Sequence, residues 1–161
     1  ELAKENLIKH AGKRGISSDR LVFAKKRSFS EYIDQLSHAD LYLDTFNYNA
    51  GATASNVLWA GVPLITKAGV GYSARMASSL LESIGMPELI TRTPEDYEAL
   101  ALNLAQNRVK LSAVRLLLSL KCINSELFDV EAFTGDLENS YRKIYQRYVE
   151  GKKPDVIYVE R

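Results

Sequence analysis

The stretch DTFNYNAGATASNVLWAGVPLIT, residues 44–66, follows the apolar run LYL, residues 41–43, and indicates how the chain folds. The apolar run predicts a buried strand. The loop after it becomes a helix near Ala52, whose first turn has small side chains and the hydroxyl of Thr53. A strand, a loop of small residues and a helix begin a βαβ unit, and such units bind ligands at the carboxyl ends of their strands.

The same alternation continues on both sides of this stretch. Strands are predicted at residues 20–24, 40–45, 62–66 and 88–91, and helices at 2–15, 28–39, 52–60, 71–85, 93–107, 109–121 and 130–151. The strand at 40–45 shows little alternation, which predicts burial on both faces. Strands that alternate with helices predict a parallel sheet. We therefore expect an α/β fold with an open doubly wound sheet of three or four strands, followed by a helical cap.

Several helix ends have recognisable signals. Ser28 precedes Glu31 by three residues, which is the spacing of a capping box. Thr93 is a predicted N-cap and is followed by proline and acidic residues in the first turn. Gly61 and Gly85 are predicted to end the helices that precede them.

Composition excludes several classes of protein. The chain has 161 residues, 46% of them hydrophobic and 25% charged, and a formal net charge of +1. Nothing in this balance calls for nucleic acid or an anionic membrane, and the single Cys122 leaves no internal disulfide and no zinc pattern. No metal site is expected. A cytoplasmic protein fits best, and because Glu1 already lies in an amphipathic segment, we interpret the chain as part of a longer polypeptide.

The loop before Ala52 has the chemistry of an anion site. A helix N-terminus offers unpaired amide donors and the positive end of the helix dipole, and this combination binds phosphate. Gly51, Ala52 and Ala54 leave room for a diphosphate to approach the backbone, and Thr53 adds a hydroxyl donor. Asn56, one turn later, could reach a sugar hydroxyl. The alternative is that small residues only allow close packing of loop and strand, with Thr53 as a helix cap.

Longer segments resemble a known family. ADLYLDTFNYNAGATASNVLWAGVPLIT, GYSARMASSLLESIGMPELI and SELFDVEAF with LENSYRKIYQRY resemble the catalytic half of the O-linked N-acetylglucosamine transferases, and more closely bacterial tetratricopeptide-repeat proteins of the SPINDLY-like group. The resemblance implies the C-terminal, Rossmann-like half of a GT-B glycosyltransferase. That half holds the UDP of a UDP-sugar donor without a metal or cofactor, and tetratricopeptide repeats lie in front of it.

The family's phosphate loop matches this chain in part. Asn49 and Thr53 match the family pattern, whereas Gly51 stands in place of a histidine and Ala52 in place of a threonine. Asn56 stands in place of an aspartate that meets the ribose, which keeps hydrogen bonding and loses a charge.

Other positions carried over from the family lie outside this loop. Phe29 and Tyr32 stand where the family has a lysine and a histidine near the nucleoside. Tyr32 could stack on uracil, Phe29 cannot replace a cation, and Arg27 is expected to contact the base through its main chain. Arg75 and Trp59 are interpreted from the residues and not from the resemblance. Arg75 could face the sugar diphosphate or, alternatively, pair with a surface carboxylate. Trp59 is expected in the core, with a stacking platform as the alternative.

The resemblance implies a nucleotide-sugar-binding domain at residues 1–154, with its helical part at 94–150 and a tail at 155–161. Its implied activity is transfer of N-acetylglucosamine or a related sugar to protein serine or threonine hydroxyls. The family's acceptor-side catalytic groups belong to the upstream half, so no catalytic residue is assigned and the chain alone is expected to be inactive. The replacements in the loop keep two alternatives open: a non-catalytic protein-binding module, and transfer from another nucleotide sugar.

Overall fold

The computed structural model describes residues 2–159 and divides the chain into two compact units, Glu1–Tyr32 and Ile33–Arg161. Residue 1 and residues 160–161, the end of the predicted tail, lie outside the described part. None of the helices in the described part is long and apolar enough to cross a bilayer.

The first unit begins with helix α1, Leu2–Gly12, and a short 3-10 helix, η1, Ser18–Arg20. Helix α2, Phe29–Ser37, starts in this unit and ends in the second. The Ser28 N–H and hydroxyl both donate to the Glu31 carboxylate, at 3.1 and 2.7 Å. The predicted capping-box pair is therefore confirmed.

The prediction of a strand at residues 20–24 is wrong. Residues 21–24 have no regular secondary structure, and the side chain of Val22 is exposed. Residues of high β propensity form a strand only when a neighbouring strand supplies hydrogen bonds and packing. The described sheet pairs only β1, β2 and β3, so residues 21–24 have no strand partner in it, and β propensity alone was misleading here.

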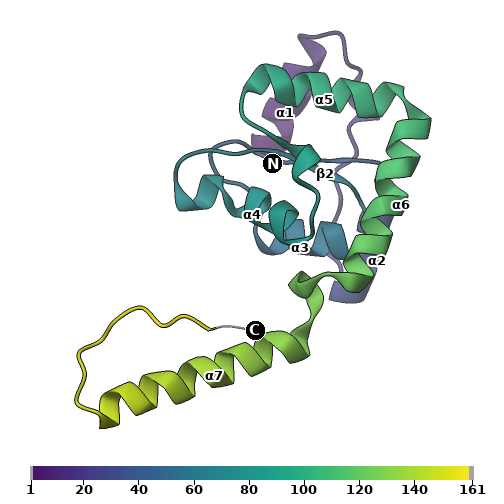
Figure 1. Cartoon of the computed structure of the whole chain (residues 1–161). Helices are drawn as coiled ribbons and strands as arrows, with labels where there is room; N and C mark the ends of the chain where they lie inside the picture. The colour runs from purple at the N-terminus through teal and green to yellow at the C-terminus, as the bar shows by residue number, and fades with distance from the viewer. Residues whose placement is uncertain (1, 160–161) are drawn as a thin grey trace. The chain divides into compact units, whose positions relative to one another are not determined.

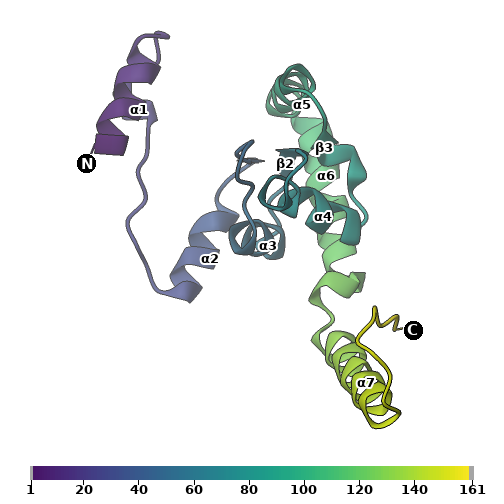
Figure 2. The same cartoon turned by 90° about the vertical axis from the view of Figure 1, so that its left-hand side faces the viewer.

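The second unit alternates strands and helices as predicted. Its elements are β1 (Tyr42–Leu43), α3 (Ala52–Trp59), β2 (Leu64–Lys67), η2 (Tyr72–Ala74), α4 (Met76–Ser83), η3 (Pro87–Leu89), β3 (Ile90–Thr91), α5 (Pro94–Gln106), α6 (Arg108–Asn124), η4 (Glu126–Phe128) and α7 (Val130–Val149). The strands form a parallel sheet in the order β1-β2-β3. Helices α3 and α4 lie on one side of it and α5 on the other (Figures 1 and 2). The predicted doubly wound α/β fold with a helical C-terminal part is confirmed.

Strand β1 differs from the prediction in its burial. Its register with β2 pairs Tyr42 with Leu64 and Leu43 with Ile65. The side chain of Leu43 is nevertheless 55% exposed, because β1 is one of the two edge strands of the described sheet. The expected burial on both faces therefore applies to β2, whose first three residues are all buried.

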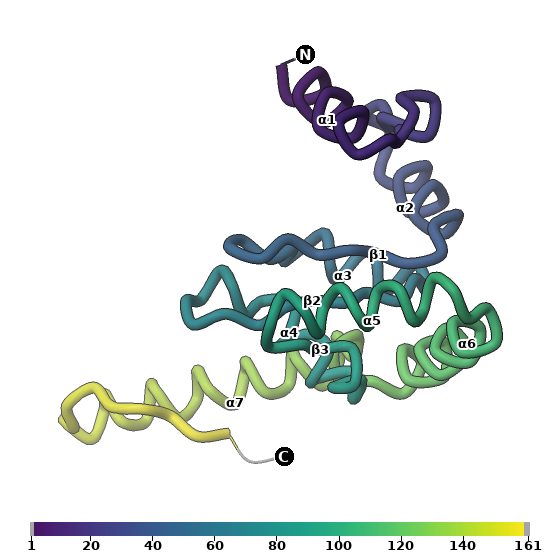
Figure 3. Tube along the Cα trace, turned by 90° about the horizontal axis from the view of Figure 1, so that it is seen from above, coloured from purple at the N-terminus to yellow at the C-terminus, as the bar shows by residue number. Residues whose placement is uncertain are grey.

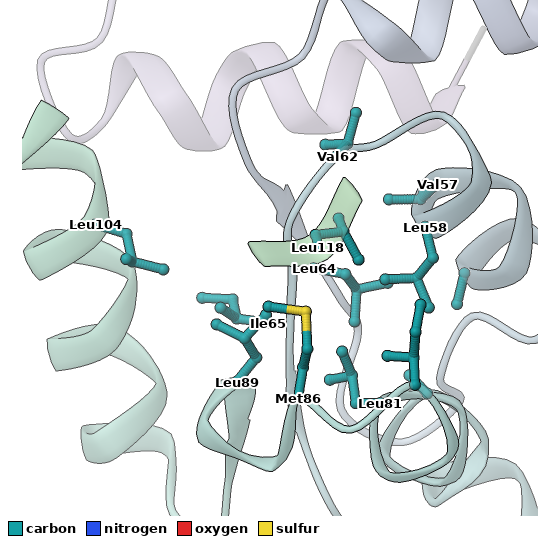
Figure 4. Packing of buried hydrophobic residues seen from close by; sticks show 13 residues of the cluster. Val57, Leu58, Val62, Leu64, Ile65, Leu81, Met86, Leu89, Leu104 and Leu118 are labelled. Atoms are coloured by element: carbon teal, nitrogen blue, oxygen red, sulfur yellow. The ribbon is translucent and has the colours of Figure 1, made fainter. Parts of the chain in front are cut away.

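The core forms where the helices cover β2. Leu64 points from β2 toward Leu58 of α3, and Ile65 points to the other face, toward Leu104 of α5 (Figure 4). Neighbouring residues of a strand face opposite sides, so one short strand can fill both halves of the core. Gly61 has a φ of 73°, a left-handed conformation that lets the chain leave α3 and enter β2.

Trp59 was predicted to lie in the core, and this is wrong. Its side chain is 63% exposed. The buried residues of α3 are Ala54, Val57 and Leu58. A residue directly after Leu58 is turned by about 100° around the helix axis, which carries the indole off the buried face.

The chain after α7 runs back along that helix (Figure 3). Lys143 donates to the carbonyl of Tyr158 at 2.7 Å, and Arg147 pairs with Asp155 at 3.1 Å. The described part of the predicted tail thus packs on α7, although it has no regular secondary structure.

Candidate functional site

The β1–α3 loop, residues 44–51, begins with a buried carboxylate. Asp44 is 4% exposed. One carboxylate oxygen accepts the Ala50 N–H at 2.8 Å, and the other accepts the Thr66 hydroxyl at 2.7 Å. A single side chain therefore ties the end of the loop, just before α3, to the neighbouring strand β2.

Helix α5 holds the same loop from the opposite face of the sheet. The Tyr97 hydroxyl donates to the Asp44 carbonyl at 2.9 Å, and the Tyr97 ring meets Phe46 edge-on with centroids 5.0 Å apart. Burial and the nearby Asp44 charge raise the pKa of Tyr97 to about 12, so its hydroxyl remains a donor at neutral pH. An open cavity of about 520 Å³ lies here, lined by Asp44, Thr45, Phe46, Asn47, Tyr48 and Tyr97.

Asn49 braces the loop from inside. It is 1% exposed; its side-chain NH₂ donates to the Thr45 carbonyl at 2.6 Å, and its backbone N–H donates to the Ser73 carbonyl at 2.8 Å. Its Oδ1 is buried without a partner among the described residues. Asn49 thus joins the β1–α3 loop to the segment before α4, and one acceptor atom remains available to a donor that enters the loop.

The N-terminus of α3 is uncapped. Gly51 precedes the helix without any side-chain hydrogen bond, and the first intrahelical bond runs from the Ser55 N–H to the Gly51 carbonyl at 3.1 Å. The amides of residues 52–54 therefore have no partner within the helix. The exposed Thr53 and the half-buried Asn56, three residues apart, share one flank, while Ala54 faces the core. This arrangement offers donors to an anion.

The start of α4 lies against this helix end. A Cβ on Gly51 would be 3.6 Å from the Met76 methyl carbon, an ordinary van der Waals contact, so the first residue of α4 lies directly beside the start of α3. Arg75, the N-cap residue of α4, is exposed and takes part in none of the ion pairs among the described residues. The alternative of a surface carboxylate partner for Arg75 is therefore not observed. Arg75 lies two residues after Ser73, whose carbonyl accepts the Asn49 N–H of the loop.

The remaining predicted site residues lie in the first unit. The Arg27 guanidinium forms an ion pair with the Glu31 carboxylate, with 4.0 Å between nitrogen and oxygen. Phe29 is exposed, and Tyr32 is the last residue of that unit. Their role beside the β1–α3 loop stays a prediction. The structure brings together the residues that the sequence placed in the loop and in α3, with Arg75 at the start of α4.

Sequence reasoning missed three contributors. Asp44 and Tyr97 shape the loop, and Lys67 ends β2 with its ammonium 5.2 Å from the centroid of the Phe46 ring. A charged residue directly after an apolar strand was the available signal for Asp44 and Lys67. Within residues 2–159, no group of three or more histidine, cysteine or acidic side chains is arranged to hold a metal ion.

Comparisons with known proteins are consistent with one another. The profile described as glycosyl transferase family 41 matches residues 2–137. A UDP-N-acetylglucosamine–peptide N-acetylglucosaminyltransferase from Caenorhabditis elegans is 30% identical over 154 residues, 96% of this chain and 13% of that protein. A probable enzyme of the same description, SPINDLY from Hordeum vulgare, is 36% identical over 124 residues, 77% of this chain and 13% of that protein.

A solved structure shows the same fold. A mutant of the Thermobaculum terrenum O-GlcNAc transferase superposes with a TM-score of 0.80 at 30% identity and covers 89% of this chain and 28% of that chain. The present chain therefore spans a minor part of each of these relatives.

Proposed function

This chain belongs to glycosyltransferase family 41, and from that premise we propose that it is the part of a glycosyltransferase that holds the nucleotide-sugar donor. The resemblance to the O-linked N-acetylglucosamine transferases is confirmed by the relatives and by the solved structure. The observation that carries the proposal is the uncapped N-terminus of α3, held at the carboxyl end of β1 by the two hydrogen bonds of the buried Asp44 carboxylate.

In this proposal, backbone and hydroxyl donors neutralise the leaving diphosphate. The amides of residues 52–54, the α3 dipole and the Thr53 hydroxyl donate to phosphate oxygens, and Arg75 supplies a positive charge. Such donors are already in place before the reaction, so they stabilise developing charge without reorganising. Asn56 would bind a sugar hydroxyl of the donor. The step needs no metal ion or cofactor in this scheme.

The donor and acceptor follow from the relatives. Two relatives are described as transferring N-acetylglucosamine from its UDP derivative to peptides, so we propose a UDP-sugar donor and a protein hydroxyl acceptor. The chain spans 13–15% of these relatives, and we expect it to bind donor and transfer nothing by itself. Tetratricopeptide repeats and a cytoplasmic location remain part of the proposal.

A second candidate is a non-catalytic protein-binding module that keeps the transferase fold. Gly51 and Ala52 provide no side-chain donor where the family has histidine and threonine, and Asn49, which matches the family, is 1% exposed. If these changes abolish binding of the nucleotide-sugar donor, the fold serves only for contacts with other proteins. The two candidates therefore differ in whether a nucleotide binds.

Replacing Thr53 by alanine is expected to weaken UDP binding by about 1 kcal/mol, or roughly fivefold, because one hydroxyl donor is lost. Titration calorimetry with UDP, UDP-N-acetylglucosamine and GDP measures this on the chain and on a longer polypeptide that carries it. The uridine nucleotides are expected to bind more tightly than GDP.

Thr53→Ser is the matched control, since it keeps the hydroxyl and should keep most of the affinity. Equal losses in both variants would assign the effect to the β-branch and not to the hydroxyl. Failure of every nucleotide to bind the longer polypeptide would leave the non-catalytic module as the function.

A further inference from the structure

A second cavity lies at the other end of α3. It measures about 670 Å³ and lies between the C-terminal ends of α3 and α6 and the segment that leads into α7. Its lining residues include two aromatic residues, two acidic residues, and a cysteine beside an isoleucine: Trp59, Phe128, Glu126, Asp129, Cys122 and Ile123. The proposed donor site uses the N-terminus of α3, so this groove, which we call the α3 C-terminal groove, is separate from it.

Aromatic rings form one wall of the groove. Trp59 and Phe128 have their ring centroids 5.2 Å apart with an interplanar angle of 64°. The indole is 63% exposed. A large indole left in solvent at the edge of a cavity is a favourable surface for a cation, because its π face carries negative electrostatic potential.

The charge of the groove has a single sign. Glu126 and Asp129 both line it, and none of its lining residues is lysine, arginine or histidine. The C-terminal end of α3, at Ala60 and Gly61, adds the negative pole of the helix dipole. Asp129 Oδ1 accepts the Ala132 N–H at 2.8 Å, and a carboxylate can accept further hydrogen bonds at its second oxygen.

The remaining wall of the groove, formed by Cys122 and its neighbours, is apolar and unreactive. The Cys122 thiol donates to the Leu58 carbonyl at 3.3 Å, and burial raises its pKa. The thiol therefore stays neutral and is not a nucleophile at neutral pH. Together with the exposed Ile123 it offers apolar contact to the methylene groups of a long side chain.

We propose that the α3 C-terminal groove binds an arginine side chain of a partner peptide. The guanidinium stacks on Trp59 and pairs with Asp129, and the side-chain methylenes lie against Cys122 and Ile123. Arginine fits this combination because a planar guanidinium can stack on an aromatic face while it donates to a carboxylate. The charge complementarity of the groove selects a basic occupant over an acidic one.

The test uses the capped peptide acetyl-Ala-Arg-Ala-amide. Its matched control carries citrulline, which has nearly the same shape as arginine and no charge. Trp59 is the only tryptophan of the chain, so its fluorescence reports on the groove. We expect saturable binding of the arginine peptide that weakens as salt is added, and much weaker binding of the citrulline peptide.

Two variants locate the binding by calorimetry. Asp129→Asn keeps the N-cap of α7, since asparagine caps as well as aspartate, and is expected to lower the affinity about fivefold. Trp59→Leu is expected to lower it by at least a similar factor. Equal affinity for the citrulline peptide, unchanged affinity in both variants, or no saturable binding would each overturn the proposal. None of these results depends on nucleotide binding.

Discussion

Replacing Asp44 by alanine is expected to lower the free energy of unfolding by about 3 kcal/mol, because two donors lose their acceptor. The Ala50 N–H, at 2.8 Å, and the Thr66 hydroxyl, at 2.7 Å, both donate to this carboxylate. Thr66 is fully buried, so water cannot replace the lost bond without opening the sheet. Urea unfolding of the two proteins measures the difference.

Asp44→Asn is the matched control for this experiment. The asparagine Oδ1 can still accept the Ala50 N–H, and its NH₂ can donate to the Thr66 hydroxyl oxygen. We therefore expect the asparagine variant to lose less than half as much stability as the alanine variant. An alanine variant as stable as the original chain would mean that these two bonds do not hold the loop.

The same carboxylate links stability to the proposed donor site. Asp44 holds Ala50, which lies one residue before the uncapped Gly51. Loss of this contact frees the loop that sets the direction of the first turn of α3. The alanine variant, measured at a temperature where it remains folded, is therefore expected to bind UDP more weakly, and the asparagine variant is expected to bind nearly normally.

Local signals in the sequence predicted most of the fold. Thr93 caps α5 by accepting the Asp96 N–H at 3.1 Å, and Gly61 ends α3 in a left-handed conformation with a φ of 73°. Both signals depend on residues that are close in the sequence, where side-chain chemistry acts directly on the backbone. Alternation of such elements then predicted that the strands run parallel in one sheet.

Contacts between residues that are far apart in the sequence could not be predicted from local patterns. The strand predicted at residues 20–24 depended on a neighbour that no local pattern reveals. Tyr97 reaches Asp44 across 53 positions of the chain, and nothing about either residue indicates the pairing. The composition of the β1–α3 loop indicated an anion site, whereas the network that holds it became visible only in the fold.

Replacing Gly69 by alanine is the second change with a large expected effect. A Cβ at this position would lie 2.6 Å from the Ala74 Cβ, well inside the contact distance of two carbon atoms. The Gly69 N–H also donates to the Ala74 carbonyl at 2.7 Å, which closes residues 69–74 into a loop. The two residues therefore cannot move apart without breaking this hydrogen bond. We expect a loss of about 2 kcal/mol in the free energy of unfolding, which is typical of overpacking.

The displacement should also reach the donor site. The Ser73 carbonyl lies in the same closed segment and accepts the Asn49 N–H at 2.8 Å. An outward shift of this segment moves both Asn49 and the exposed Arg75 away from the N-terminus of α3. Weaker UDP binding is therefore expected in the Gly69→Ala variant, in addition to the lower unfolding midpoint.

Ala74→Gly provides the compensating change, because it removes the atom that the new methyl group would strike. A double-mutant cycle measures the coupling between the two positions. The double variant is expected to recover at least half of the stability lost by Gly69→Ala, and to recover UDP binding with it. If the two losses simply add, steric overlap with the Ala74 side chain is not the cause of the lost stability.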